Sequence, residues 1–141
     1  MAFSSVHEMI DLCKESGKPL YEVILESDLA ESGLTRAESE AEMHRLWAVM
    51  QATSDGYCGA DRSMSGFAGG DAAKVNAAAA RGVLYADGYF ADVMAEALKT
   101  AECNACMKRI VAAPTAGACG VLPAVLLPCA RHFSLSREQL V

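Results

Sequence analysis

The sequence lacks any long hydrophobic run and any excess of basic residues. Its apolar stretches, of which Val121 to Leu127 is typical, fall far short of the ~18 residues that span a bilayer. The first residues show neither the basic start nor the apolar body of a signal peptide. Twelve Lys and Arg stand against eighteen Asp and Glu, a formal charge of -6, whereas nucleic-acid grooves need clustered cations. We therefore expect a cytoplasmic protein that binds neither membranes nor nucleic acids.

Repeated cysteine pairs at the spacing of a zinc knuckle are also missing. The 141 residues include six cysteines, but only Cys103 and Cys106 form a Cys-x-x-Cys pair, and its neighbours are typical of a helix interior. A reducing compartment disfavours disulfides. Packing or a surface thiol is the favoured interpretation of this pair, with metal binding as the weaker alternative. We predict no metal ligand in this chain.

Helical signals cover most of the chain and predict an all-α fold. Capping boxes open helices at Ser5 and Thr35, and Gly17 and Gly33 end two of them. The length suits one domain. The apolar periodicity predicts a helical bundle of about six helices with a long glycine-rich loop. The expected helices cover residues 5–16, 19–32, 36–53, 71–81, 89–112 and 118–132, and the loop covers 54–70.

The last residues indicate an incomplete fold. Ser136-Arg137-Glu138-Gln139 is a capping box that opens a helix, and only two residues follow it. So short a helix does not form alone, because nucleation costs more than its few hydrogen bonds return. We therefore expect residues 1–141 to be the amino-terminal part of a truncated α domain.

The stretch from Ala113 to Pro123 is a turn of small residues that runs into an apolar helix. Pro114 ends the preceding helix, and Gly117 and Gly120 let the backbone come close to a ligand. The first N–H groups of the next helix lack partners within the helix, which suits a carboxylate or phosphate. Close helix packing explains the small residues equally well, so the residues alone leave both interpretations open.

Two further places carry candidate ligand-binding groups. The long loop holds Ser65 and the run Gly69-Gly70-Asp71, which precedes a helix, and loops of this length usually serve as lids or binding loops. A solvated loop with Asp71 as a simple cap is the alternative. Asn104 is an amide in the apolar stretch of the expected fifth helix, where it is either a satisfied packing residue or a donor to a ligand.

Two stretches carry a family resemblance. They run from Ser65 to Ala72 and from Ala101 to Pro123, and the second contains Ala-Pro-Thr-Ala-Gly-x-x-Gly-x-x-Pro. Both resemble the amino-terminal portion of the α chain of iron-sulfur-dependent L-serine dehydratase, also called L-serine ammonia-lyase. Gly17-Lys18-Pro19 and Glu31-Ser32-Gly33-Leu34 are similar to that family too, so the resemblance covers nearly the whole chain.

The resemblance implies a lyase of amino-acid degradation and gluconeogenesis that converts L-serine to pyruvate and ammonia at a [4Fe-4S] cluster. The cysteine contexts that hold this cluster in the family, and the Ser-His-Thr motif of its β domain or subunit, do not occur in this sequence. The chain is then expected to be inactive alone and to need a β subunit or domain and the rest of the α chain. Catalytic residues stay unassigned. The substrate-binding residues carried over are Thr115, Ala116, Gly117, Gly120, Ser65, Gly69, Gly70, Asp71 and Asn104.

Two alternatives belong to other classes. One is a fragment of a related cluster-dependent lyase of the cysteine desulfidase type, because the residues that choose the leaving group lie near the cluster. The other is a non-catalytic helical remnant that keeps only the turn for a small ligand. The residues present do not separate these from the preferred interpretation.

Overall fold

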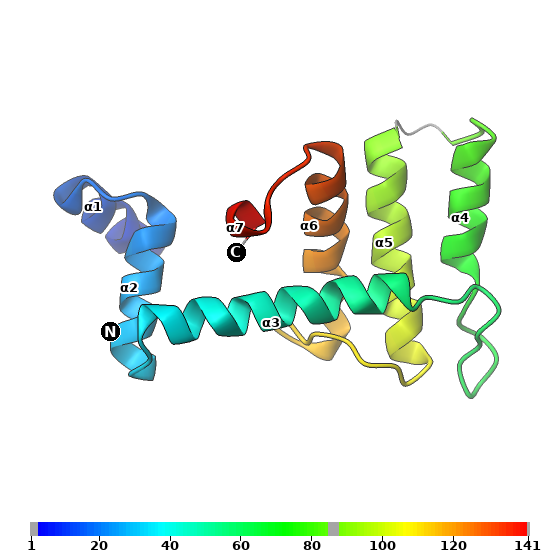
Figure 1. Ribbon diagram of the computed structural model, residues 1–141, viewed down its shortest axis with the longest axis horizontal. Helices are drawn as coiled ribbons and strands as arrows, with labels where there is room; N and C mark the ends of the chain where they lie inside the picture. Colours follow the sequence, from blue (N-terminus) through cyan, green and yellow to red (C-terminus); the bar gives the residue numbers. More distant parts are fainter. Residues whose placement is uncertain (1–2, 85–87, 141) are drawn as a thin grey trace. The chain divides into compact units, whose positions relative to one another are not determined.

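A computed structural model describes residues 3–84 and 88–140. All regular structure in these two stretches is helical, which confirms the all-α prediction. The helices are α1 (Val6–Ser16), α2 (Leu20–Ser32), α3 (Arg36–Asp55), α4 (Asp71–Ala80), α5 (Gly88–Ala105), the 3-10 turn η1 (Ala116–Ala118), α6 (Val121–His132) and α7 (Arg137–Leu140) (Figure 1). Within the described part, no helix has the length and hydrophobicity needed to cross a membrane.

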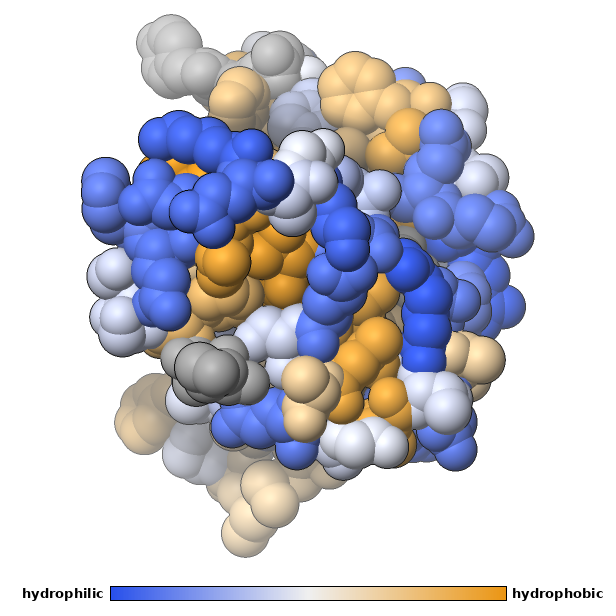
Figure 2. Space-filling model, turned by 90° about the vertical axis from the view of Figure 1, so that its left-hand side faces the viewer, coloured by the Kyte–Doolittle hydropathy of each residue, from blue (hydrophilic) through white to orange (hydrophobic). Residues whose placement is uncertain are grey.

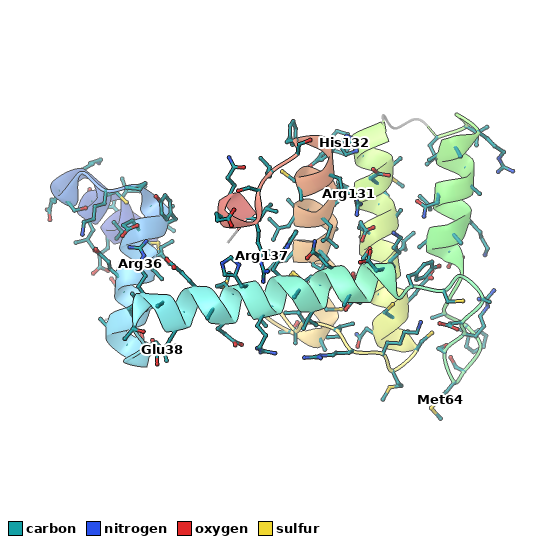
Figure 3. All side chains as sticks on the ribbon, viewed as in Figure 1. Arg36, Glu38, Met64, Arg131, His132 and Arg137 are labelled. Atoms are coloured by element: carbon teal, nitrogen blue, oxygen red, sulfur yellow. The ribbon has the colours of Figure 1, made fainter. Side chains whose placement is uncertain are left out.

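The chain divides into two compact units, Met1–Met43 and His44–Val141. In the first unit α1 contacts α2, and the predicted capping box at the start of α3 is confirmed. The Thr35 hydroxyl accepts from the Glu38 amide at 3.3 Å, and the Glu38 carboxylate accepts from the Thr35 amide at 2.8 Å. Figure 3 labels Glu38 at this helix start. Reciprocal capping of this kind fixes where a helix begins.

The first unit leaves much of its apolar surface exposed. Val23 is the one buried residue in α1 and α2. Figure 2 shows hydrophobic surface open between polar side chains on one face of the molecule. Apolar surface left open in this way is typical of a face that contacts another protein part. The exposed apolar residues of the two helices include Val6, Ile10, Leu20, Tyr21 and Ile24.

In the second unit α4, α5 and α6 lie side by side with neighbours antiparallel, and α5 is in the middle (Figure 1). The buried face of α5 includes Ala91 and Ala95, and Ala72 of α4 and Ala124 of α6 are also buried. Small side chains at these positions let helix backbones approach closely. The three helices therefore form a tightly packed layer.

Charged groups join α5 to α6 along the same contact. Glu96 is almost fully buried, and its Oε1 accepts from Lys99 at 2.6 Å and from Arg131 at 3.3 Å. His132 Nε2 lies 2.9 Å from Asp92 Oδ2. Figure 3 shows Arg131 and His132 at the end of α6. The buried Glu96 carboxylate thus has two cationic partners at the interface of the two helices, where burial requires a charge to be paired.

Two predicted helix boundaries are wrong. The helix expected over 89–112 ends at Ala105, because Met107 adopts a left-handed conformation with φ 60°. The Lys108 amide bonds to the Cys103 carbonyl at 2.9 Å and the Met107 amide to the Asn104 carbonyl at 3.0 Å, the Schellman pattern that ends helices. That position is usually glycine, so the sequence carries no stop signal here.

The second corrected boundary is the start of the last long helix. Residues 116–118 form the 3-10 turn η1 and α6 begins only at Val121, three residues later than predicted. The helix then continues through the buried Pro128 to His132. The α3 helix also runs to Asp55, so the predicted glycine-rich loop begins at residue 56.

The contact between α5 and the start of α6 generates a stability prediction. A Cβ placed on Gly120 would lie 3.0 Å from the backbone oxygen of Ala97, whereas one on Gly117 would meet only the Thr115 hydroxyl at 3.8 Å. We expect Gly120→Ala to lower the free energy of unfolding by about 1 to 3 kcal/mol, because backbone atoms must move apart. Gly117→Ala should change it by less than about 0.5 kcal/mol. Urea denaturation of both variants tests this, and equal losses would contradict it.

Candidate functional site

The turn before α6 is held by its own side chain and by α5. Thr115 is the N-cap of η1, and its hydroxyl accepts a hydrogen bond from the Ala118 amide at 3.2 Å. The preceding Ala113-Pro114 peptide bond is cis. The side-chain amide of Asn104 donates to the Ala116 carbonyl at 3.1 Å. The end of α5 thus fixes the position of the turn.

A cavity of about 280 Å³ lies between this turn and α5. Two backbone amides of the turn donate to acceptors in the turn itself. The Ala118 amide donates to Thr115, and the Cys119 amide donates to the Ala116 carbonyl at 3.4 Å. Four other backbone amides of the turn have no hydrogen-bond acceptor among the described residues. Those four belong to Ala116, Gly117, Gly120 and Val121, and all four residues line the cavity.

The arrangement can bind a small anion. Unpaired N–H groups at a helix start carry partial positive charge, and the dipole of α6 adds to it. The apolar part of the lining comes from Ala97, Ala101 and Val121, and Asn104 adds a polar side chain. A small organic acid with a carboxylate and a few further atoms suits this combination. The structure thus brings Asn104, a separate candidate in the sequence, to the cavity that Ala116, Gly117 and Gly120 of the predicted turn also line. Thr115, the remaining candidate of the turn, lies next to Ala116 in the chain.

The other predicted residues lie at the start of α4, where a carboxylate of the chain itself is already bound. Glu102, which is 6% exposed, accepts hydrogen bonds from three successive backbone amides. Its Oε2 accepts from Gly70 at 2.9 Å, and its Oε1 accepts from Asp71 at 2.7 Å and Ala72 at 3.1 Å. The helix start that the sequence offers to an anion is thus capped from α5.

The loop before α4 is folded on itself. The Ser63 amide donates to the Ala68 carbonyl at 2.9 Å, and the Ser65 hydroxyl lies 3.1 Å from that of Ser63. Gly69 has φ 128°, and a Cβ there would lie 2.2 Å from the backbone oxygen of Asp61, so only glycine fits. Met64 extends from the tip of the loop (Figure 3) and is 97% exposed. Ser65 and Gly69 therefore lie apart from the cavity at the turn, and ligand binding by them stays a prediction.

Sequence reasoning missed Glu102 and its partner Tyr57. The Tyr57 hydroxyl donates to Glu102 Oε2 at 2.7 Å and accepts from the Ala73 amide at 3.3 Å. Burial, and then the hydrogen bond to Glu102, raises the pKa of Tyr57 to about 12. The one available signal was a glutamate inside a helical stretch of small and apolar residues, where an unpaired charge is costly.

The cysteines do not form a site for an iron-sulfur cluster. All six are free, and Cys13, Cys119 and Cys129 lie on different elements from the other three. Cys58, Cys103 and Cys106 line one pocket, but it has no room for a water-sized molecule. No group of three or more metal-binding side chains occurs in residues 3–84 and 88–140. The described part of the chain therefore does not fit the [4Fe-4S] cluster that the resemblance implies.

The buried carboxylate generates a second stability prediction. Glu102→Ala leaves three amides of α4 and the Tyr57 hydroxyl without their acceptor, and each buried donor then lacks a partner. We expect the free energy of unfolding to fall by about 2 to 4 kcal/mol. The exposed Glu15→Ala is the matched control and should cost less than about 0.5 kcal/mol. A Glu102→Ala protein as stable as this control in chemical denaturation would refute the role of the carboxylate as a cap.

Tyr57 gives a prediction for alkaline pH. Its pKa rises from 10.0 to about 12 on folding, so between these values the unfolded chain loses the proton while the folded chain keeps it. Stability from this group is complete below pH 10 and is lost as pH rises toward 12. We expect Tyr57→Phe to be less stable than the parent by about 1 kcal/mol at neutral pH. The difference should shrink above pH 10, as followed by urea denaturation in a pH series, and a constant difference would contradict the assignment.

Comparison with known proteins shows which family the chain resembles in sequence. The family model described as serine dehydratase alpha chain matches residues 15–141. The L-serine dehydratase alpha chain of Peptoniphilus asaccharolyticus is 31% identical over 138 residues, which cover 97% of this chain and 47% of that protein. The probable L-serine dehydratase alpha chain of Bacillus subtilis is 30% identical over 139 residues, covering 99% of this chain and 46% of the relative.

The chain thus spans about half the length of the curated relatives it matches. No solved structure matches it. The family match includes the turn with its cavity, Asn104 and the Glu102 network, since all of them lie between residues 15 and 141. From this match we conclude that the chain belongs to the serine dehydratase alpha chain family.

Proposed function

We propose that this chain is part of an enzyme that converts L-serine to pyruvate and ammonia, and that it binds the substrate's carboxylate at the turn before α6. The observation that carries the proposal is that one cavity is lined by four residues whose backbone amides have no acceptor among the described residues. A carboxylate has the charge and the acceptor oxygens that these donors need. The names of the two relatives support L-serine as the substrate.

Carboxylate binding at this turn does two things for an elimination reaction. It orients the amino acid, which converts a collision into a fixed geometry. It also draws electron density from the carboxylate, which makes the neighbouring α-proton easier to remove. Loss of that proton and of the β-hydroxyl gives an enamine, and water then releases pyruvate and ammonia. Thr115 and Asn104 contribute by holding the amides in place, since each bonds within the turn.

The remaining machinery is proposed to lie outside the described residues. The resemblance implies a [4Fe-4S] cluster, whose ligands we place elsewhere in the enzyme because the cysteines described here do not gather around a space for it. Both relatives are named alpha chains, and we propose that a β subunit or domain supplies the catalytic base. The exposed apolar surface of the first unit offers area for such contacts. We place the reaction in the cytoplasm, in amino-acid degradation.

The carboxylate site can be tested on the chain itself by NMR. In a titration of ¹⁵N-labelled protein, we expect L-serine to shift the backbone amide signals of Gly117, Gly120 and Val121, because these N–H groups gain an acceptor. Ethanolamine, which is serine without its carboxylate, should shift none of them. Thr115→Val removes the hydroxyl that caps the turn and should weaken the response several-fold.

Thr35→Val is the matched control, because Thr35 caps α3 in the same way in the first unit. This variant should leave the response to L-serine unchanged. Equal shifts with L-serine and ethanolamine, or shifts at α4 in place of the turn, would overturn the proposed position of the carboxylate.

A further inference from the structure

Three cysteines from two distant segments line one narrow pocket of the second unit. Cys58 comes from the loop after α3, and Cys103 and Cys106 come from the carboxyl-terminal end of α5. The pocket has no room for a water-sized molecule. The proposed function uses none of these thiols.

Two contacts between residues that line the pocket hold the segments together. Tyr57 bonds to Glu102 at 2.7 Å, and the ammonium of Lys108 pairs with Asp61. The pKa of Lys108 is raised, first by its hydrogen bond to Asp61 and also by attraction to Cys58. Since Cys58 lies between Tyr57 and Asp61 in the sequence, it is held opposite the stretch that contains the Cys-x-x-Cys pair.

The three thiols differ in their access to solvent. Cys103 is buried, its Sγ lies 3.8 Å from the Thr53 carbonyl, and burial raises the pKa of its thiol. Cys58 is exposed and Cys106 is half-buried. An oxidant in solution reaches an exposed thiol first, because oxidation follows thiolate character and exposure. The pair able to react is therefore Cys58 and Cys106.

We propose that Cys58 and Cys106 form a redox site in which a peroxide joins them in an intramolecular disulfide. The Cys58 thiolate attacks the O–O bond of hydrogen peroxide, which gives a sulfenic acid and releases hydroxide. The Cys106 thiolate then attacks the Cys58 sulfur and displaces the second oxygen as hydroxide. The two hydroxides take up the two thiol protons, so two thiols and one peroxide give one disulfide and two waters.

The disulfide would fasten a junction that two weaker contacts already hold. It would join the loop after α3 to the end of α5 between the Tyr57–Glu102 hydrogen bond and the Asp61–Lys108 ion pair. A covalent bond across two segments far apart in sequence restricts the unfolded chain and stabilises the folded one. Oxidation would thus rigidify the part of the unit that positions both α4 and the turn before α6.

Peptide mapping of the protein tests the proposal directly. The reduced chain is treated with an equimolar amount of hydrogen peroxide, blocked with an alkylating reagent, digested and analysed by mass spectrometry. We expect one linked peptide pair containing Cys58 and Cys106, a loss of two hydrogen masses from the intact chain, and a melting temperature that rises and returns with dithiothreitol. Cys58→Ser and Cys106→Ser should each abolish the linked pair.

Cys13→Ser and Cys129→Ser are the matched controls, because these half-buried thiols lie on α1 and α6 and neither lines the pocket. Both variants should still form the bond. A Cys103→Ala variant should form it as well. Any of three results with the unaltered chain would overturn the proposal: six free thiols, a Cys103–Cys106 bond, or disulfides only between molecules.

Discussion

The second unit depends on one buried carboxylate. Glu102 accepts four hydrogen bonds, three from the amides that start α4 and one from Tyr57. A charge in this position is favourable only because every acceptor site has a donor and the helix start carries partial positive charge. Without it, α4 would begin with unpaired amides, and the loop before it would lose its connection to α5.

The end of α5 joins three segments through three consecutive residues. Glu102 holds the start of α4, the thiol of Cys103 lies against the Thr53 carbonyl of α3, and Asn104 holds the Ala116 carbonyl in the turn before α6. Successive side chains on a helix point in directions about 100° apart, so one helix turn can serve three neighbours. The cavity at the turn is a consequence of this arrangement, because Asn104 sets the distance between the turn and α5.

The starts of α4 and α6 differ in whether a side chain of the protein binds their backbone amides. The functional interpretation rests on this difference. The start of α4 is filled by Glu102, whereas the start of α6 faces a cavity with its amides unpaired. Both are preceded by glycine-containing runs that look equally suited to an anion. The chain supplies its own carboxylate to one and leaves the other open, which is why we propose the turn that contains Thr115 and Gly117 as the position of an external carboxylate.

The sequence by itself determined the helical fold and the cap of α3 at Thr35, because these rest on local periodicity and on capping chemistry. For the turn before α6 it left ligand binding and close helix packing both open. Only the tertiary structure decided that α5 ends at Ala105, two residues before the left-handed Met107, and that Glu102 occupies the start of α4. Both outcomes depend on partners distant in the sequence or on a left-handed residue other than glycine. Local patterns cannot show them, since a hydrogen bond between residues thirty positions apart leaves no periodic signal.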